Sequence, residues 1–185
     1  MLSCLRSMWP WGHLAFGYVV YSLYHRVVYR EPPTDWVTVV ATFGTQFPDL
    51  VDKPLAWWFG VLPNGRSLTH SVITAIVVIA LVHLVAQRWN RGPIAVAFAI
   101  GYVCHLATDA VGPILGGTPA KLAFLLWPVL PAIEYNDGGL VSHFMHVDLT
   151  PIFWVQAMAI VFVFATWYID GAPGTFGLLS PDSDR

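Results

Sequence analysis

The sequence predicts an all-α protein: a polytopic membrane helical bundle with about five transmembrane helices and one re-entrant or interfacial segment. The chain of 185 residues is 56% hydrophobic and only 11% charged, whereas soluble domains carry roughly 25% charged residues. Its nine Trp, seven Tyr and eleven Phe residues suit the aromatic belts at membrane interfaces. A soluble protein with a very large core is the alternative, but so few polar side chains could not cover a surface that faces water.

Apolar stretches with the length of a membrane span occur five times along the chain. The stretch from Lys121 to Ile133 is also apolar, but it is short and contains two prolines, which favours a re-entrant or interfacial segment. The five expected spans run from about Trp9 to Val28, Asp35 to Val51, Thr69 to Gln87, Pro93 to Leu115 and Thr150 to Ile169.

The sequence indicates one domain. Residues 1–170 are expected to form a single integral-membrane unit, and residues 171–185, which are rich in Gly, Pro and Ser, a mobile acidic tail. The first apolar stretch lacks a small-residue cleavage site and is expected to stay as a helix. Cys104 lies deep in an apolar run, which favours packing over a disulfide with Cys4. A net charge of −2 without a basic run argues against nucleic acid as a partner.

His105 and Asp109 are the most informative pair of residues. They stand four apart, and Asp109 is the only formal charge between Gly92 and Ala120. A carboxylate at membrane depth costs at least a few kcal/mol unless it is paired, bound to metal or facing a water-filled cavity. An imidazole one helical turn away favours a metal site. A hydrogen-bonded His–Asp pair that locks helices together is an equally good explanation of these two residues alone.

When successive expected spans alternate in direction across the membrane, three further residues with metal-binding side chains fall at the same end of the bundle as Asp109. His13 lies near the start of the first expected span, Asp49 near the end of the second, and His70 opens the third. Prolines flank the Asp49 region, which predicts a helix-ending turn that directs carboxylates at a cavity. Asp52 neighbours Lys53, which favours a position at the membrane interface.

Arg66 precedes the third span and is the expected anion-binding residue. Its planar guanidinium could bind a phosphate or carboxylate with two hydrogen bonds, although an ordinary interfacial arginine explains it about as well. Arg66 and Asp52 are the two residues predicted to take part in catalysis. His143, with His146 near it in a long connection, is a further metal-ligand candidate, whereas His25 and His83 lie away from the convergent end and are excluded.

The donor set limits the metal. Asp49 and Asp109 supply two negative charges, which neutralise one divalent ion surrounded by neutral histidines. Mixed His and carboxylate ligation suits zinc best, with manganese or iron as alternatives. A second ion would need a further carboxylate, so one or two ions are expected.

Three motifs together resemble a known family. In chain order they are Phe47-Pro48-Asp49, Gly65-Arg66-Ser67-Leu68-Thr69-His70-Ser71, and Gly101-Tyr102-Val103-Cys104-His105-Leu106-Ala107-Thr108-Asp109. They resemble the YdjM-like family of LexA-binding, inner-membrane-associated metal-dependent hydrolases, which is distantly similar to zinc-dependent phospholipases C.

The resemblance implies a location in the inner membrane of a prokaryote and phosphoester hydrolysis by a metal-activated water. It also implies a ligand set. The implied ligands are His13, Asp49, His70, His105 and Asp109, with His143 or His146 as an addition.

The leading functional hypothesis is a membrane-embedded metal-dependent hydrolase acting on a phosphoester or lipid-linked anionic substrate. A structural or regulatory membrane protein that binds metal without catalysis is the main alternative. An ion or proton pathway is the third, since intramembrane Asp and His residues can form relays.

Overall fold

The computed structural model describes residues 10–133 and 151–176, and these are helical without any strand. The all-α prediction is therefore confirmed for the described part of the chain. The elements are α1 (Pro10–Tyr29), α2 (Asp35–Trp57), α3 (Val72–Arg88), α4 (Gly92–Leu115), the 3₁₀ helix η1 (Pro119–Leu126) and α6 (Pro151–Ile169).

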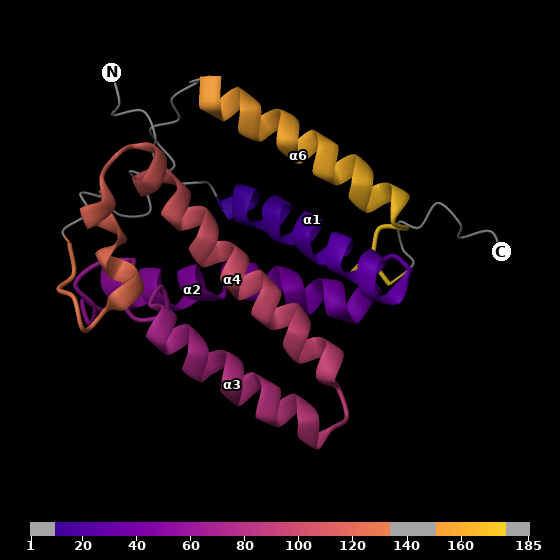
Figure 1. The fold of residues 1–185 in the computed structure, drawn as a ribbon, viewed down its shortest axis with the longest axis horizontal. Coiled ribbons are helices and arrows are strands. Elements are labelled where there is room, and N and C mark those ends of the chain that lie inside the picture. Colours follow the sequence, from indigo (N-terminus) through magenta and orange to yellow (C-terminus); the bar gives the residue numbers. More distant parts are fainter. Residues whose placement is uncertain (1–9, 134–150, 177–185) are drawn as a thin grey trace.

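Helix α4 is the centre of the bundle. It packs against α1, α2, α3 and η1, while α6 lies along the outer side of α1 (Figure 1). A helix in this position has to present small or apolar side chains in several directions. The buried residues of α4 accordingly lie on more than one face, and they include both aromatic side chains and the polar residues of the candidate site.

The backbones of α2 and α4 touch directly. A Cβ atom added at Gly101 would lie 2.1 Å from the carbonyl oxygen of Ala41, and one added at Gly44 would lie 2.5 Å from the carbonyl oxygen of Phe98. Two glycines on facing helices thus remove the side chains that would otherwise separate them, which is the usual way for helices to approach closely in membranes. This contact fixes the position of α4 relative to the polar residues of α2.

The predicted helix boundaries are close to the observed ones except at the end of α2. The prediction of a helix-ending turn around Asp49 is wrong, because α2 continues through Pro48 and Pro54 to Trp57. Each proline removes one helical N–H bond, but neighbouring elements hold this part of α2: the Thr69 hydroxyl, for example, donates to the Pro48 carbonyl at 3.0 Å. Tertiary contacts have overridden the local signal of the prolines.

Helix α4 alone, among the helices of residues 10–133 and 151–176, is both long and apolar enough to cross a membrane by itself. Helix α3 and the part of α6 from Ala157 to Ile169 are apolar but shorter. Helices α1 and α2 have sufficient length, but they carry the histidines, threonines and aspartates that the site and the helix contacts use. The structure therefore supports one span directly.

A second polar cluster closes the bundle at the end opposite the candidate site. Asp170, which follows α6, accepts hydrogen bonds from Tyr18 at 2.6 Å and Ser22 at 2.7 Å, and it pairs with Arg26. Asp35 at the start of α2 accepts from the backbone of Gly174 at 2.6 Å. The beginning of the predicted mobile tail, residues 171–176, is thus folded onto the bundle, and residues 177–185 lie outside the described part.

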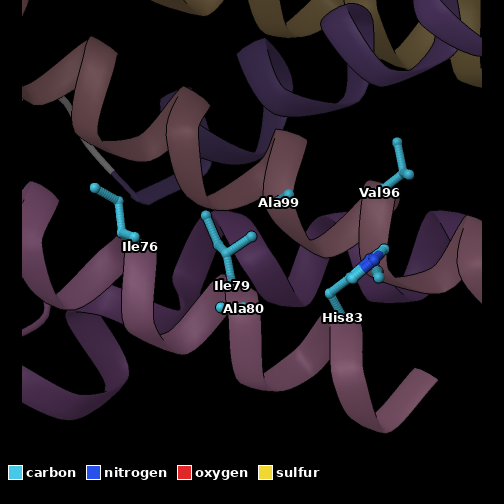
Figure 2. A pocket seen from close by; sticks show the side chains of 7 residues that line it. Ile76, Ile79, Ala80, His83, Val96 and Ala99 are labelled. Atoms are coloured by element: carbon cyan, nitrogen blue, oxygen red, sulfur yellow. The ribbon is translucent and has the colours of Figure 1, made fainter. Parts of the chain in front are cut away.

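A surface groove of about 350 Å³ lies between α3 and α4, and none of the five candidate metal ligands lines it (Figure 2). Alkyl side chains form almost all of it, with His83 at one end, where the ring nitrogen Nε2 contacts the Gln87 amide at 2.8 Å. The exclusion of His83 from the site agrees with this position. The lining residues are Ile76, Ile79, Ala80, His83, Ala95, Val96 and Ala99.

Gly101→Ala is expected to lower stability substantially. The new methyl group would overlap the Ala41 carbonyl oxygen, which belongs to the backbone and cannot turn away, and overpacking of this kind costs about 1–3 kcal/mol or more. Thermal unfolding of the purified protein in detergent measures the loss. Gly92→Ala in the same helix is the matched control, because nothing lies within 4 Å of its added Cβ; equal stability of the two variants would contradict the close contact.

Candidate metal centre

Five metal-ligand side chains from four segments meet at one end of the bundle. His13 comes from α1, Asp49 from α2, His70 from the turn before α3, and His105 and Asp109 from α4. Two overlapping groups have ligand atoms that all lie within 4.8 Å of one another: His13, His105 and Asp109, and Asp49, His70 and His105. The structure thus brings together the five residues expected from the sequence.

The separations between the ligand atoms fit a small divalent ion. His70 Nε2 lies 3.1 Å from His105 Nε2, 3.4 Å from Asp49 Oδ1 and 3.4 Å from Asp109 Oδ2. His105 Nε2 lies 3.6 Å from Asp109 Oδ2 and 3.9 Å from Asp49 Oδ1. Donors bound tetrahedrally to zinc at about 2.0–2.1 Å lie roughly 3.3 Å from each other. These spacings are therefore compatible with the donors of one shared ion.

The other ring nitrogen of His70 and of His105 faces a group that can only accept a hydrogen bond. His105 Nδ1 lies 2.6 Å from the Thr45 carbonyl oxygen, and His70 Nδ1 lies 2.8 Å from the Asp52 carboxylate. Both Nδ1 atoms must therefore carry hydrogen. When the His70 and His105 rings are both neutral, each Nε2 atom carries a lone pair, and the two lone pairs point into the same space. They repel each other unless a proton or a metal cation lies between them.

His13 is held in the same tautomer by a less direct route. Its Nδ1 lies 2.6 Å from the Thr108 hydroxyl oxygen, and that hydroxyl donates its own hydrogen to the carbonyl oxygens of Cys104 and His105, both at 2.9 Å. The Thr108 oxygen therefore accepts from His13, and the His13 Nε2 lone pair faces Asp109 Oδ1 at 3.6 Å. A hydrogen-bonded acceptor on the second ring nitrogen is the usual support of a metal-binding histidine.

Each ligand carboxylate has a cation on one oxygen and faces His70 and His105 with the other. Lys53 Nζ lies 2.6 Å from Asp49 Oδ2, and Arg66 Nη2 lies 3.0 Å from Asp109 Oδ1. The oxygens nearest His70 are Asp49 Oδ1 and Asp109 Oδ2. Both cations are partly exposed, by 24% for Lys53 and 15% for Arg66, so they lie between the buried ligands and the surface.

The charges around the centre leave room for one divalent ion. Asp49, Asp52 and Asp109 bring three negative charges, and Lys53 and Arg66 bring two positive ones, so the net charge with neutral histidines is one negative. A divalent ion changes this to one positive, which an anionic ligand would neutralise. Two ions would leave three positive charges in a buried site, so the balance favours one.

In the metal-free protein the proton on His70 takes the place of a cation. Burial by itself lowers the pKa of His70, but hydrogen bonds to Asp49 and Asp52 and the charge of Asp109 outweigh it and raise the pKa to about 9. A pKa of about 9 favours the charged ring at neutral pH. The Nδ1–H group of this ring faces the Asp52 carboxylate, and its Nε2–H group faces His105 Nε2 at 3.1 Å and the carboxylates of Asp49 and Asp109 at 3.4 Å. A metal that binds here has to displace this proton.

Asp52 occupies a different place from the one its neighbour Lys53 indicated. It is fully buried rather than interfacial, because its carboxylate accepts from the backbone N–H groups of Ser67 and Thr69, from the Thr69 hydroxyl and from His70. It lies on the Nδ1 side of His70, away from the convergent Nε2 atoms. A catalytic role for Asp52 stays a prediction, and its contacts point to holding and orienting the His70 loop.

Two supports of the histidines were not assigned from sequence. The Thr45 carbonyl is a backbone group and leaves no sequence signal, whereas Thr108 lies in the stripe of small and polar residues of α4 that marks the helix's inner face. His143, the remaining predicted ligand, lies outside the described residues, as does His146. His25 lies at the opposite end, where Nδ1 is 3.0 Å from the Glu31 carbonyl oxygen.

Comparison with known families shows to which family the chain belongs. The model of the YdjM inner membrane protein family matches residues 8–178. The chain belongs to this family. The match covers nearly the whole chain and gives a membrane location, but no reaction; hydrolysis and the similarity to phospholipase C stay predictions. A search of curated proteins and a search of solved structures each found no significant match.

Stability of the metal-free protein should fall as the pH rises toward about 9. The pKa of His70 is higher in the folded state than the ordinary value of 6.5, so its contribution is complete below about pH 6.5 and is lost as the pH rises through about 9. Unfolding measured in the presence of a chelator between pH 6 and 10 tests this. His70→Gln should remove most of the slope, and an unchanged slope would contradict the charged His70.

Asp52→Asn should weaken metal binding about 10- to 100-fold, the usual effect of removing a carboxylate that orients a ligand histidine. The amide that replaces the Asp52 carboxylate would present N–H groups toward the backbone N–H groups of Ser67 and Thr69 and toward the His70 ring, all of which donate to the carboxylate. The His70 ring would therefore lose its orientation. Competition with a fluorescent zinc chelator gives the affinity. Asp35→Asn, at the other end of the same helix, is the matched control; equal affinities of the two variants would exclude an orienting role for Asp52.

Proposed function

We propose that the chain is an integral membrane protein whose five long helices all cross the membrane, and that it is a metal-dependent hydrolase of a phosphoester substrate. The family match and the apolar helix α4 support the membrane location. The observation that carries the metal is the pair of Nε2 atoms of His70 and His105, 3.1 Å apart with both Nδ1 atoms already bound to acceptors.

The residues fit a zinc ion, with manganese or iron as alternatives. Three imidazole nitrogens and two carboxylate oxygens form the donor set, which suits these metals and not calcium. His105 offers only Nε2, because Nδ1 is bound to the Thr45 carbonyl, and both groups of candidate ligands use this atom. We therefore propose one ion rather than two, with Asp49, His70, His105 and Asp109 closest to it and His13 beside it.

A divalent ion in this position would act as a Lewis acid on a phosphoryl oxygen and lower the pKa of a coordinated water. The chain's own residues supply the rest. Lys53 and Arg66 hold the outer oxygens of Asp49 and Asp109 and lie on the exposed side of the centre. Each has several N–H donors, so they can bind the anionic oxygens of a phosphoester while they keep the carboxylates oriented.

His105→Ala and Asp109→Ala test the proposal. Each variant should lose its bound metal, measured by elemental analysis of the purified protein. Each should also lower the turnover of a phosphoester such as a p-nitrophenyl phosphodiester by more than about a hundredfold, because loss of a ligand should cost at least as much as loss of a residue that only supports one. Treatment of the wild-type protein with a chelator should have the same effect, and added zinc or manganese should restore activity.

His83→Ala is the control, because this histidine lies on α3 near the surface groove and away from the centre. Full activity in either site variant would exclude the metal centre as the catalytic site. Stoichiometric metal in the wild-type protein, with no turnover of phosphomonoesters, phosphodiesters or carboxylic esters, would replace the proposal by a metal-binding protein without catalysis.

A further inference from the structure

Two charge-free segments border the metal centre with exposed apolar side chains. Residues 58–63 follow α2 and residues 127–133 follow η1, and neither segment contains Asp, Glu, Lys or Arg. Trp58, Phe59 and Val61 are each 69% exposed, and Val129 is 74% exposed. We call these two segments the apolar lip. Exposed apolar side chains are expected on membrane-facing helices, but here they lie on non-helical chain at the end of the bundle.

The turns at the opposite end of the bundle are different. Residues 30–34 contain Arg30 and Glu31, and residues 90–92 contain Asn90 and Arg91, all of them exposed. Such turns suit the aqueous boundary of a membrane. The lack of charge in the apolar lip is therefore not a general property of the connections in this chain.

The backbone of the apolar lip is compatible with a non-aqueous environment. The N–H groups of Trp58 and Phe59 donate to the Pro54 carbonyl, and that of Val61 donates to the Leu55 carbonyl at 2.8 Å, so the chain folds back on the end of α2. In the other segment the Leu130 N–H donates to the Leu126 carbonyl at 3.1 Å. Non-helical chain enters a membrane only where such groups have partners within the protein.

The apolar lip is joined to the site loop by Asn64. Its amide donates to the Ile133 carbonyl at 2.8 Å, which ties the two segments together, and its side-chain oxygen accepts from the Arg66 backbone N–H at 2.8 Å. The two segments and the loop with Arg66 lie side by side at one end of the bundle (Figure 1).

Contacts on the other side of Arg66 bring Lys53 into the same region. A Cβ on Gly65 would lie 3.3 Å from Lys53 Cγ and 3.5 Å from the Trp57 ring. The loop with Arg66 and the Lys53 side chain thus lie beside Trp57, the residue directly before the first segment of the apolar lip.

We propose that the apolar lip lies among the lipids at the membrane interface. The phosphate of a membrane lipid headgroup binds to Lys53 and Arg66, and the acyl chains lie against Trp58, Phe59 and Val129. This rests on the proposed function and names its substrate class, an anionic phospholipid. A cationic pair bordered by apolar side chains matches a molecule with a phosphate attached to hydrocarbon, whereas a soluble phosphoester gains nothing from the exposed aromatic rings.

Native mass spectrometry of the full-length protein in mild detergent tests the binding separately from catalysis. The probes are phosphatidic acid, phosphatidylcholine and glycerol 3-phosphate. Wild-type protein should retain phosphatidic acid in preference to the other two. Arg66→Gln should weaken binding of phosphatidic acid about tenfold or more, since a hydrogen bond to a charged group is lost.

The apolar lip is tested by the double substitution Trp58→Ser and Phe59→Ser, with Val129→Ser as an independent variant from the second segment. Each should weaken binding of phosphatidic acid, by roughly tenfold for the double variant, and leave binding of glycerol 3-phosphate unchanged. Trp89→Ser is the matched control, because Trp89 is 70% exposed at the opposite end, and it should change neither.

The outcomes separate this inference from the proposed function. Equal retention of phosphatidic acid and phosphatidylcholine, or a lip variant that binds phosphatidic acid as well as the Trp89 control does, would overturn the lipid assignment even if the protein hydrolyses soluble phosphoesters. Preferential binding of phosphatidic acid that the lip variants weaken would support it, even in a protein that hydrolyses nothing. Equal weakening by the double Trp58→Ser and Phe59→Ser variant and by Trp89→Ser would also overturn it, because the effect would then be general.

Discussion

The close contact between α2 and α4 determines the rest of the structure. Where Gly101 faces Ala41, the two backbones touch, and the added atom that would prevent this contact would also lie 2.9 Å from the Thr45 backbone nitrogen. The carbonyl of the same Thr45 fixes the tautomer of His105. One helix contact therefore places a backbone acceptor beside a histidine ring and directs the other ring nitrogen at the metal centre. If the helices were separated by even one methyl group, neither arrangement would survive.

The centre illustrates how a buried group of charges is maintained in an apolar protein. Every ionised side chain has a partner of opposite charge or several hydrogen bonds: Asp52 receives donors from the His70 loop, and Asp49 and Asp109 each have a cation on one oxygen. Breaking one partner of such a set is expensive, because the remaining charge stays buried without compensation. These residues consequently form a unit, and the metal, the cations and the orienting groups have to be considered together.

Much of this could be predicted from the sequence, and the exceptions have physical reasons. The helices follow from the apolar stretches, and the convergence of His13, Asp49, His70, His105 and Asp109 follows from alternating the direction of successive spans. The continuation of α2 through Pro48 and Pro54 could not be predicted, since the contacts that hold it come from residues far along the chain. The burial of Asp52 was hidden by its neighbour Lys53, which signals a surface position, and a backbone acceptor such as Thr45 has no sequence signature at all.

The order of the ligands along the chain has a consequence for biosynthesis. The five side chains come from α1, α2, the turn before α3, and α4, and the last of them is Asp109. A growing chain cannot assemble these five ligands until the fourth of its long helices has been made, so the earlier histidines and carboxylates are synthesised before their partners exist. Helix α6, which packs on the outer side of α1, follows afterwards. The chain order therefore allows the five described ligands to assemble before the bundle is complete.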